Sequence, residues 1–263
     1  LKSDKKATSF NWSEVLRPML TLAVFALIFL MIRHSVLSKI ASGDPSIADN
    51  LLMAAKSYDQ KFATAVLILG MYLKLLFIPH PLVFDYSYNQ IPLVGIGNMW
   101  FILSLLIHTG LLIWAVIIWK KNKLLSFTIL FYFISMSIYS NIFYMIGSSF
   151  GERFLYTASF GFCMAVAYAL SLISRNQNAE NVVAFFKNNL TVLLILMPVA
   201  AAFAYKTITR NTVWKSNYTL YANDVNLSPN STRTHYYYGN LLAKDDFQKG
   251  KTKVALVTPQ KGG

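Results

Sequence analysis

Long uninterrupted apolar runs constrain this chain more than any other feature. The clearest extends from Trp100 to Trp119 without an acidic or basic residue other than His108. A membrane-spanning helix needs about 20 apolar residues because the hydrocarbon layer is about 30 Å thick. Hydrophobic residues make up 55% of the chain and charged residues only 13%, against roughly 25% charged in soluble proteins. We therefore predict an all-α protein, a polytopic membrane helix bundle.

The apolar runs predict about five spanning helices. They cover residues 18–37, 100–119, 124–139, 155–172 and 190–205. Lys120, Lys121 and Lys123 indicate the cytoplasmic end of the second run by the positive-inside rule. Loops 80–98 and 141–156 and the C-terminal region should then lie on the non-cytoplasmic side, in a bacterial inner membrane or the endoplasmic reticulum.

The apolar segment 62–78 conflicts with this topology. Segment 18–37 should end outside and segment 100–119 should start outside, so segment 62–78 would begin and end on one face. We predict that it is interfacial or re-entrant, with Lys74 reaching toward the headgroups. A spanning helix with a weak topology signal is the alternative. Before it, the mixed charges and apolar spacing after Asp49 predict an amphipathic surface helix.

The composition divides the chain into three parts. Residues 1–206 form the membrane domain, and residues 207–247 have helical spacing on either side of Pro229. That second part predicts a non-cytoplasmic helical hairpin of the repeat type, in which Gly239 lets two helices pack closely. One such unit cannot bury its own apolar face. Residues 248–263 are rich in lysine and glycine and predict a disordered tail.

Several functional classes are disfavoured. The net charge of +13 could suggest nucleic acid, but many basic residues lie close to the apolar runs, where they orient a membrane protein. No nucleic-acid partner is expected. The single cysteine and the four dispersed histidines predict neither a metal site nor a cofactor. Ionisable residues are sparse in the apolar runs, which argues against a transporter. The chain begins with Leu1, and we expect it to be part of a longer protein.

The first polar segment between apolar runs is residues 80–94. Pro81 and Pro92 bracket it, and this predicts a loop. Asp85 at its centre is a weak catalytic candidate that would orient a sugar hydroxyl or act as a general base. A structural aspartate that caps a helix or pairs with Arg153 is the alternative, and both interpretations stay open. The remaining substrate-binding candidates in this loop are His80, Tyr86, Tyr88 and Asn89.

The second polar segment lies within residues 141–156. Ser149 and Glu152 have the spacing of a capping box. The same helix start would offer free amides to an anion, and Arg153 adds a guanidinium suited to phosphate. Glu152 and Arg153 are therefore substrate-binding candidates as well. Farther along, Arg210 belongs to a basic, aromatic patch that predicts headgroup anchoring and is a weaker substrate-binding candidate.

Three sequence blocks carry a resemblance to a known family. They are His80-Pro-Leu-Val-Phe-Asp-Tyr-Ser-Tyr-Asn-Gln-Ile-Pro-Leu-Val, Gly151-Glu-Arg-Phe-Leu-Tyr and Thr209-Arg-Asn-Thr-Val-Trp. In this order they resemble the transmembrane and tetratricopeptide-repeat O-mannosyltransferase-like proteins, which are GT-C type glycosyltransferases. The resemblance implies a polyprenyl-phosphate sugar donor, mannose as a candidate sugar, and repeats that select acceptor proteins. Asp85, Glu152 and Arg153 match motif positions, and Arg153 is the expected ligand of the donor phosphate.

The resemblance also has a gap. In this fold the catalytic acid usually sits in the first outer loop, and no such loop is found here. We expect the chain to match the C-terminal membrane half of such an enzyme and to be incomplete without its N-terminal half. The alternative function is a non-catalytic membrane anchor that presents tetratricopeptide repeats for protein binding.

Overall fold

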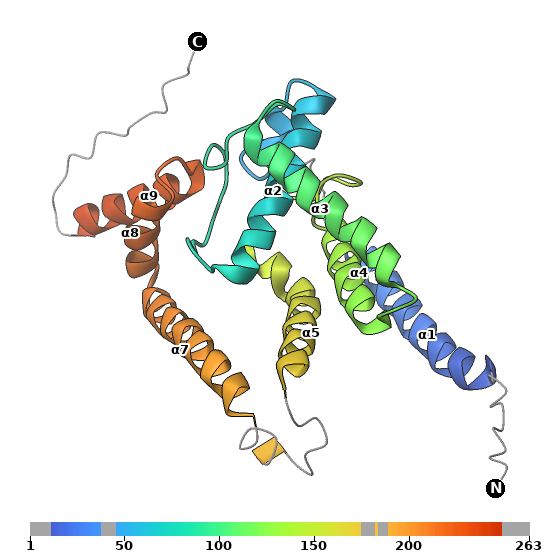
Figure 1. Cartoon of the computed structure of the whole chain (residues 1–263). Helices are drawn as coiled ribbons and strands as arrows, with labels where there is room; N and C mark the ends of the chain where they lie inside the picture. The colour runs from blue at the N-terminus through green and yellow to red at the C-terminus, as the bar shows by residue number, and fades with distance from the viewer. Residues whose placement is uncertain (1–11, 38–45, 175–181, 184–188, 249–263) are drawn as a thin grey trace, which may run out of the picture. The chain divides into compact units, whose positions relative to one another are not determined.

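The computed structural model describes residues 12–37, 46–174, 182–183 and 189–248. These residues form helices and connecting loops, and no strand occurs among them. The chain divides into two compact units at residue 44, each of which is described by itself. Figure 1 shows the helices. The prediction of an all-α membrane protein is confirmed.

The first unit contains one helix, α1 (Trp12–Leu37). Its side chains between residues 19 and 32 are exposed all round, although nearly all are apolar. A helix that is apolar on every side is typical of a membrane span.

Three antiparallel helices form the bundle of the second unit: α3 (Met99–Ile118), α4 (Lys123–Ser137) and α5 (Leu155–Ile173). Near the α3–α4 turn, the Ser126 hydroxyl donates to the Ala115 carbonyl at 2.7 Å. Because the helices alternate in direction, α3 and α5 begin where α4 ends. We call this the loop end of the bundle, since it carries the long loops.

Close packing of α4 against α5 depends on Gly161. A Cβ atom at this position would come within 2.8 Å of the Thr128 carbonyl oxygen and 3.2 Å of the Phe131 ring. At the loop end the rings of Tyr139 and Phe154 stack with centroids 4.7 Å apart. The two helices are therefore in contact along much of their length.

Helix α2 (Tyr58–Phe77) crosses the bundle obliquely. Phe62 in its second turn contacts Phe101, the third residue of α3, with ring centroids 6.1 Å apart. Phe77 at its other end contacts Phe162, with centroids 4.9 Å apart. The N-terminal end of α2 thus lies beside the start of α3, and its C-terminal end lies beside the middle of α5.

Four described helices are long and apolar enough to cross a membrane: α2, α3, α5 with its preceding turn, and α7 (Leu190–Val213). The length of α2 would allow it to span. The interfacial or re-entrant arrangement stays a prediction.

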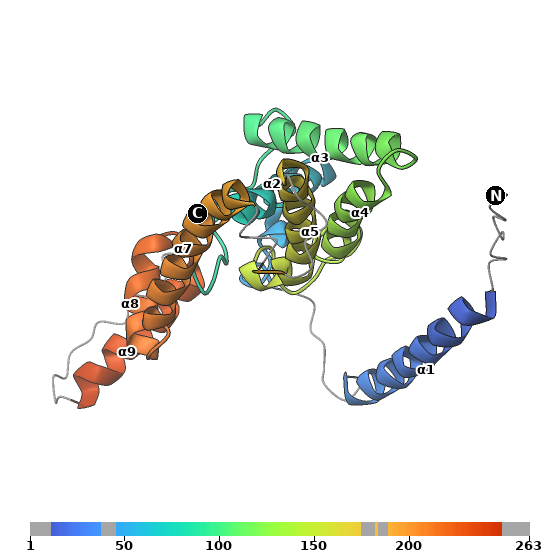
Figure 2. The same ribbon diagram turned by 60° about the horizontal axis from the view of Figure 1, so that its bottom comes forward.

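Helix α7 continues past residue 205 and leads into a hairpin of α8 (Asn217–Leu227) and α9 (Thr232–Gln248). Ser216 caps α8 by accepting a hydrogen bond from the Thr219 amide at 3.1 Å. The rings of Tyr221 and Tyr237 stack between the two helices with centroids 5.3 Å apart. In the view of Figure 2, α8 and α9 again lie side by side.

Two local predictions were wrong. The expected amphipathic surface helix is a short 3-10 helix, η1 (Leu51–Ala54), in which Leu51 and Leu52 are buried. Asn50 holds it inside, because its side-chain amide donates to Asn141 at 2.9 Å and to the Ile146 carbonyl at 2.8 Å. Gly239 does not serve close packing, since a Cβ atom there would meet nothing within 4 Å. The tail predicted at residues 248–263 lies, apart from Gln248, outside the described residues.

The packing predicts different effects on stability when alanine replaces two helical glycines. Gly161→Ala should lower the stability of the folded chain by about 1–3 kcal/mol, because the methyl group meets backbone atoms. Gly110→Ala is the control: nothing lies within 4 Å of a Cβ atom at that position, so the change should be neutral or slightly stabilising. Thermal unfolding in detergent micelles measures both, and equal midpoints would contradict the close contact.

Candidate functional site

The loop of residues 80–94 is tied to the start of α5 by Glu152. The Val83 N–H donates to Oε1 of Glu152 at 2.8 Å, and the Tyr86 hydroxyl donates to the same oxygen at 2.7 Å. The Tyr86 ring also packs edge-on against Phe150 with centroids 4.6 Å apart. Burial raises the pKa of Tyr86, and the nearby Glu152 carboxylate raises it further. The two polar segments singled out from the sequence therefore meet at the loop end.

The predicted capping box of Ser149 and Glu152 is wrong, because Glu152 binds the loop instead. The short 3-10 turn that begins at Glu152 has Gly151 at its cap position and no side-chain cap hydrogen bond. The Gly151 N–H donates instead to the Tyr72 hydroxyl at 3.0 Å. Glu152 serves a distant loop rather than its own helix start.

The hairpin holds the next residue of the loop. The Phe84 N–H donates to Oδ2 of Asp224 at 2.7 Å, and the Phe84 ring lies 5.0 Å from that of Tyr221. The Asp224 side chain is fully buried and forms a bidentate ion pair with Arg210, with nitrogen–oxygen distances of 2.6 and 2.8 Å. Two adjacent amides of one loop are thus bound by carboxylates from two different elements.

Arg210 is therefore not a headgroup anchor. Its side chain is only 12% exposed, both terminal nitrogens bind Asp224, and its guanidinium lies 5.6 Å from the centre of the Trp214 ring. One helical turn earlier, the Lys206 ammonium contacts Nδ1 of His80 at 3.1 Å. Within the predicted patch, Arg210 forms a buried ion pair and Lys206 forms a polar contact to the loop.

Asp85 occupies a second junction between the loop and the hairpin. Its carboxylate accepts from the Ser87 amide at 2.8 Å and from the Ser231 hydroxyl at 2.9 Å, and it pairs with Arg233 at 3.4 Å. Arg233 also binds Asp49. Hydrogen bonds, first from Ser46 and second from Arg233, lower the pKa of Asp49. The expected alternative of pairing between Asp85 and Arg153 is wrong.

Backbone hydrogen bonds complete the junction. The Asn89 N–H donates to the Asn230 carbonyl at 2.8 Å, and the Thr232 N–H donates to the Tyr88 carbonyl at 2.9 Å. The Asn230 N–H donates to the side chain of Gln90 at 3.0 Å. Tyr88 and Asn89 thus bind the hairpin through their main chain, while their side chains are exposed.

Sequence reasoning missed Asp224 and Arg233. Asp224 lies four residues after Leu220, and both side chains are buried on one face of α8. An acid on the apolar face of a helix needs a charged partner, and this was the available signal. Arg233 carries no comparable pattern, because its two partners lie 148 and 184 residues away in sequence.

Arg153 differs from the other two arginines near the loop. Within the described residues, Arg210 and Arg233 form ion pairs and Arg153 does not. Its side chain is exposed, and its guanidinium lies 4.9 Å from the centre of the Phe154 ring. That geometry leaves a guanidinium at the loop end whose hydrogen-bond donors can meet an external anion.

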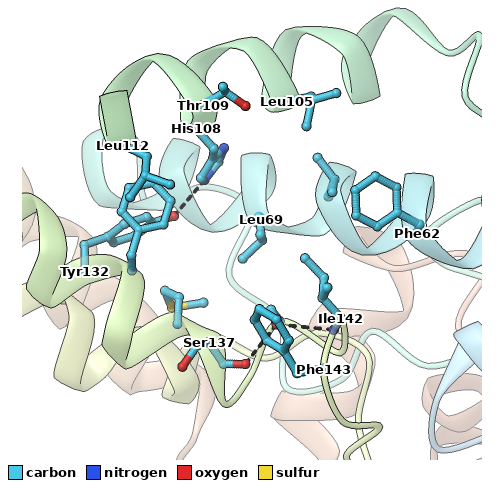
Figure 3. A pocket seen from close by; sticks show the side chains of 14 residues that line it. Phe62, Leu69, Leu105, His108, Thr109, Leu112, Tyr132, Ser137, Ile142 and Phe143 are labelled. Carbon is cyan, nitrogen blue, oxygen red and sulfur yellow. Dashed lines mark hydrogen bonds between the residues drawn. The ribbon is translucent and has the colours of Figure 1, made fainter. Parts of the chain in front are cut away.

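A separate groove lies between α2, α3 and α4 (Figure 3). It has a volume of about 230 Å³ and is lined mainly by apolar side chains around a hydrogen bond of 3.1 Å between His108 and Tyr132. Its lining has no Asp, Glu, Lys or Arg. The groove therefore suits hydrocarbon rather than a sugar or a phosphate.

The fold and these contacts define an integral membrane protein whose helical hairpin is docked on a polar loop. Comparison with curated proteins confirms the family resemblance. Over 95% of its length the chain is 27% identical to the mouse protein O-mannosyl-transferase TMTC1. Over 68% of its length it is 32% identical to the protein O-mannosyl-transferase F38B6.6 of Caenorhabditis elegans, and over 79% it is 26% identical to mouse TMTC4.

The similarity covers a limited part of these relatives. The chain spans 26%, 24% and 27% of their respective lengths. No protein-family model matches the chain, and no solved structure matches it.

The contacts of Glu152 predict how the loop responds to its removal. In Glu152→Ala the buried Val83 N–H loses a charged acceptor, which costs roughly 1.5–3 kcal/mol. Exchange of the Val83 amide with deuterium should accelerate at least about tenfold. Tyr86→Phe is the control, because it removes the other donor and leaves the Val83 bond in place. Equal exchange in both variants would contradict this account.

Proposed function

We propose that this chain is part of a membrane glycosyltransferase. In the proposal a sugar, with mannose as the candidate, moves from a polyprenyl phosphate to a protein hydroxyl on the non-cytoplasmic side. The names of the relatives and the four apolar helices support this reading. The observation that carries it is the exposed Arg153, which forms no ion pair with the described residues and lies next to Glu152, where the two polar segments meet.

Arg153 would bind the donor phosphate. A guanidinium forms two parallel hydrogen bonds to phosphate oxygens, and the aromatic ring beneath it keeps the fork in place. Glu152 uses Oε1 for the loop, so its second oxygen would accept a hydrogen bond from a sugar hydroxyl. Lys206 and His80 would supply a further positive contact.

The catalytic base is proposed to lie outside this chain. Asp85 remains a weak candidate, since both its oxygens already bind the hairpin or the loop. The relatives are about three to four times as long as the chain. In the proposal their remaining part supplies the acidic residue that acts as this base, and the hairpin begins an array of tetratricopeptide repeats that presents the acceptor protein.

A membrane anchor is the second candidate function. It is favoured by the many contacts that fix the hairpin to the loop and use Asp85, Arg210 and Asp224 for structure. An anchor would need the docked hairpin, but it would not need an exposed Arg153 that forms no ion pair with the described part of the chain.

Binding of a lipid phosphate separates the two functions. A short-chain prenyl phosphate, citronellyl phosphate, should bind the chain in detergent micelles, and Arg153→Ala should weaken this binding at least about tenfold because two charge-assisted hydrogen bonds are lost. Lys215→Ala is the control, since Lys215 is exposed on the hairpin side of α7. Isothermal titration gives both constants. No binding, or equal binding by the two variants, would leave the anchor as the function.

A further inference from the structure

The Val83–Phe84 segment of the loop is held between two buried or half-buried carboxylates. Glu152 binds the Val83 amide at 2.8 Å from the start of α5, and Asp224 binds the Phe84 amide at 2.7 Å from α8. The two acceptors belong to different elements, the turn before α5 and helix α8. The segment therefore cannot follow one of these elements without losing its hydrogen bond to the other.

Asp224 is fixed in turn by the membrane helix that leads to the hairpin. Arg210 of α7 holds both its carboxylate oxygens, and Asn223 donates a further hydrogen bond at 2.8 Å. A buried carboxylate with this many partners has one position. The same carboxylate therefore joins the hairpin to α7 through Arg210 and to the loop through Phe84.

We infer that Arg210 and Asp224 are positioning residues: docking of the hairpin through this ion pair orders the loop and so places Glu152 in the donor site. This inference rests on the proposed function for the identity of the ligand. Its structural part, the dependence of the Val83–Glu152 bond on Asp224, stands on the contacts alone. Partners bound to the hairpin would then affect the site through one peptide segment.

The chain offers a way to restore docking without the ion pair. The hydroxyl oxygens of Ser87 and Ser231 lie 3.1 Å apart across the junction, and both side chains are buried, so cysteines at these positions would have their sulfur atoms close together. In a Cys163→Ser background, Ser87→Cys and Ser231→Cys should cross-link on oxidation. Cys163 is the single native cysteine and is exposed.

The test measures deuterium exchange of the Val83 amide, whose own acceptor is untouched, together with binding of citronellyl phosphate. Asp224→Ala should accelerate the exchange and weaken the binding at least about tenfold each, and the oxidised cross-link should return both to within about twofold of the parent. Lys244→Ala, an exposed change on α9, should alter neither. Should Asp224→Ala fail to fold, Arg210→Met with Asp224→Leu removes the pair without leaving a buried charge.

The outcomes separate the inference from the proposed function. Unchanged Val83 exchange in the Asp224 variant, or exchange that the cross-link does not restore, would overturn the inference. Weaker binding with a protected Val83 amide would also overturn it, because Asp224 would then act on the ligand directly. A parent chain that does not bind citronellyl phosphate would refute the proposed function, while the exchange measurements would still decide the role of Asp224.

Discussion

The loop between α2 and α3 depends on hydrogen bonds that it cannot make with itself. A buried peptide N–H needs an acceptor, and the amides of Val83 and Phe84 have no helix or strand to supply one. Glu152 and Asp224 provide these acceptors from positions 69 and 140 residues away. The conformation of the loop is thus a consequence of tertiary structure, and the bundle and hairpin must both be in place before it is defined.

The two junctions between loop and hairpin differ in kind. Asp224 is fully buried and Arg210 nearly so, and breaking a buried pair by removing one partner is strongly destabilising because a charge is left alone. Arg233 and Asp49 are 35% and 40% exposed, and such pairs contribute little because water screens them. The Arg210–Asp224 pair therefore fixes the hairpin, while the Arg233 contacts select its orientation through geometry more than through energy.

The sequence predicted features that depend on local pattern. Apolar runs predicted the helices, since lipid and core packing both require them, and Pro81 and Pro92 predicted the loop. The sequence also predicted that loops 80–98 and 141–156 lie on one side of the bundle. The hydrogen-bond partners of Glu152 could not be predicted, because a carboxylate at this position can cap its own helix or bind a distant amide equally well. Gly239 shows the same limit: a small residue permits close packing but does not require it.

The contrast among the arginines bears most directly on function. Arg210 and Arg233 each have a carboxylate within reach, as expected for guanidinium groups that build a structure, whereas Arg153 rests on Phe154 and has no ion pair within the described residues. A guanidinium adjacent to a buried acid at the end of a membrane bundle has two possible partners, lipid headgroups in general or one bound phosphate. The hydrogen bonds that fix Glu152 beside it favour the second, because a headgroup anchor gains nothing from a neighbouring carboxylate held in one position. A sugar phosphate, which has both hydroxyls and an anion, would use both side chains.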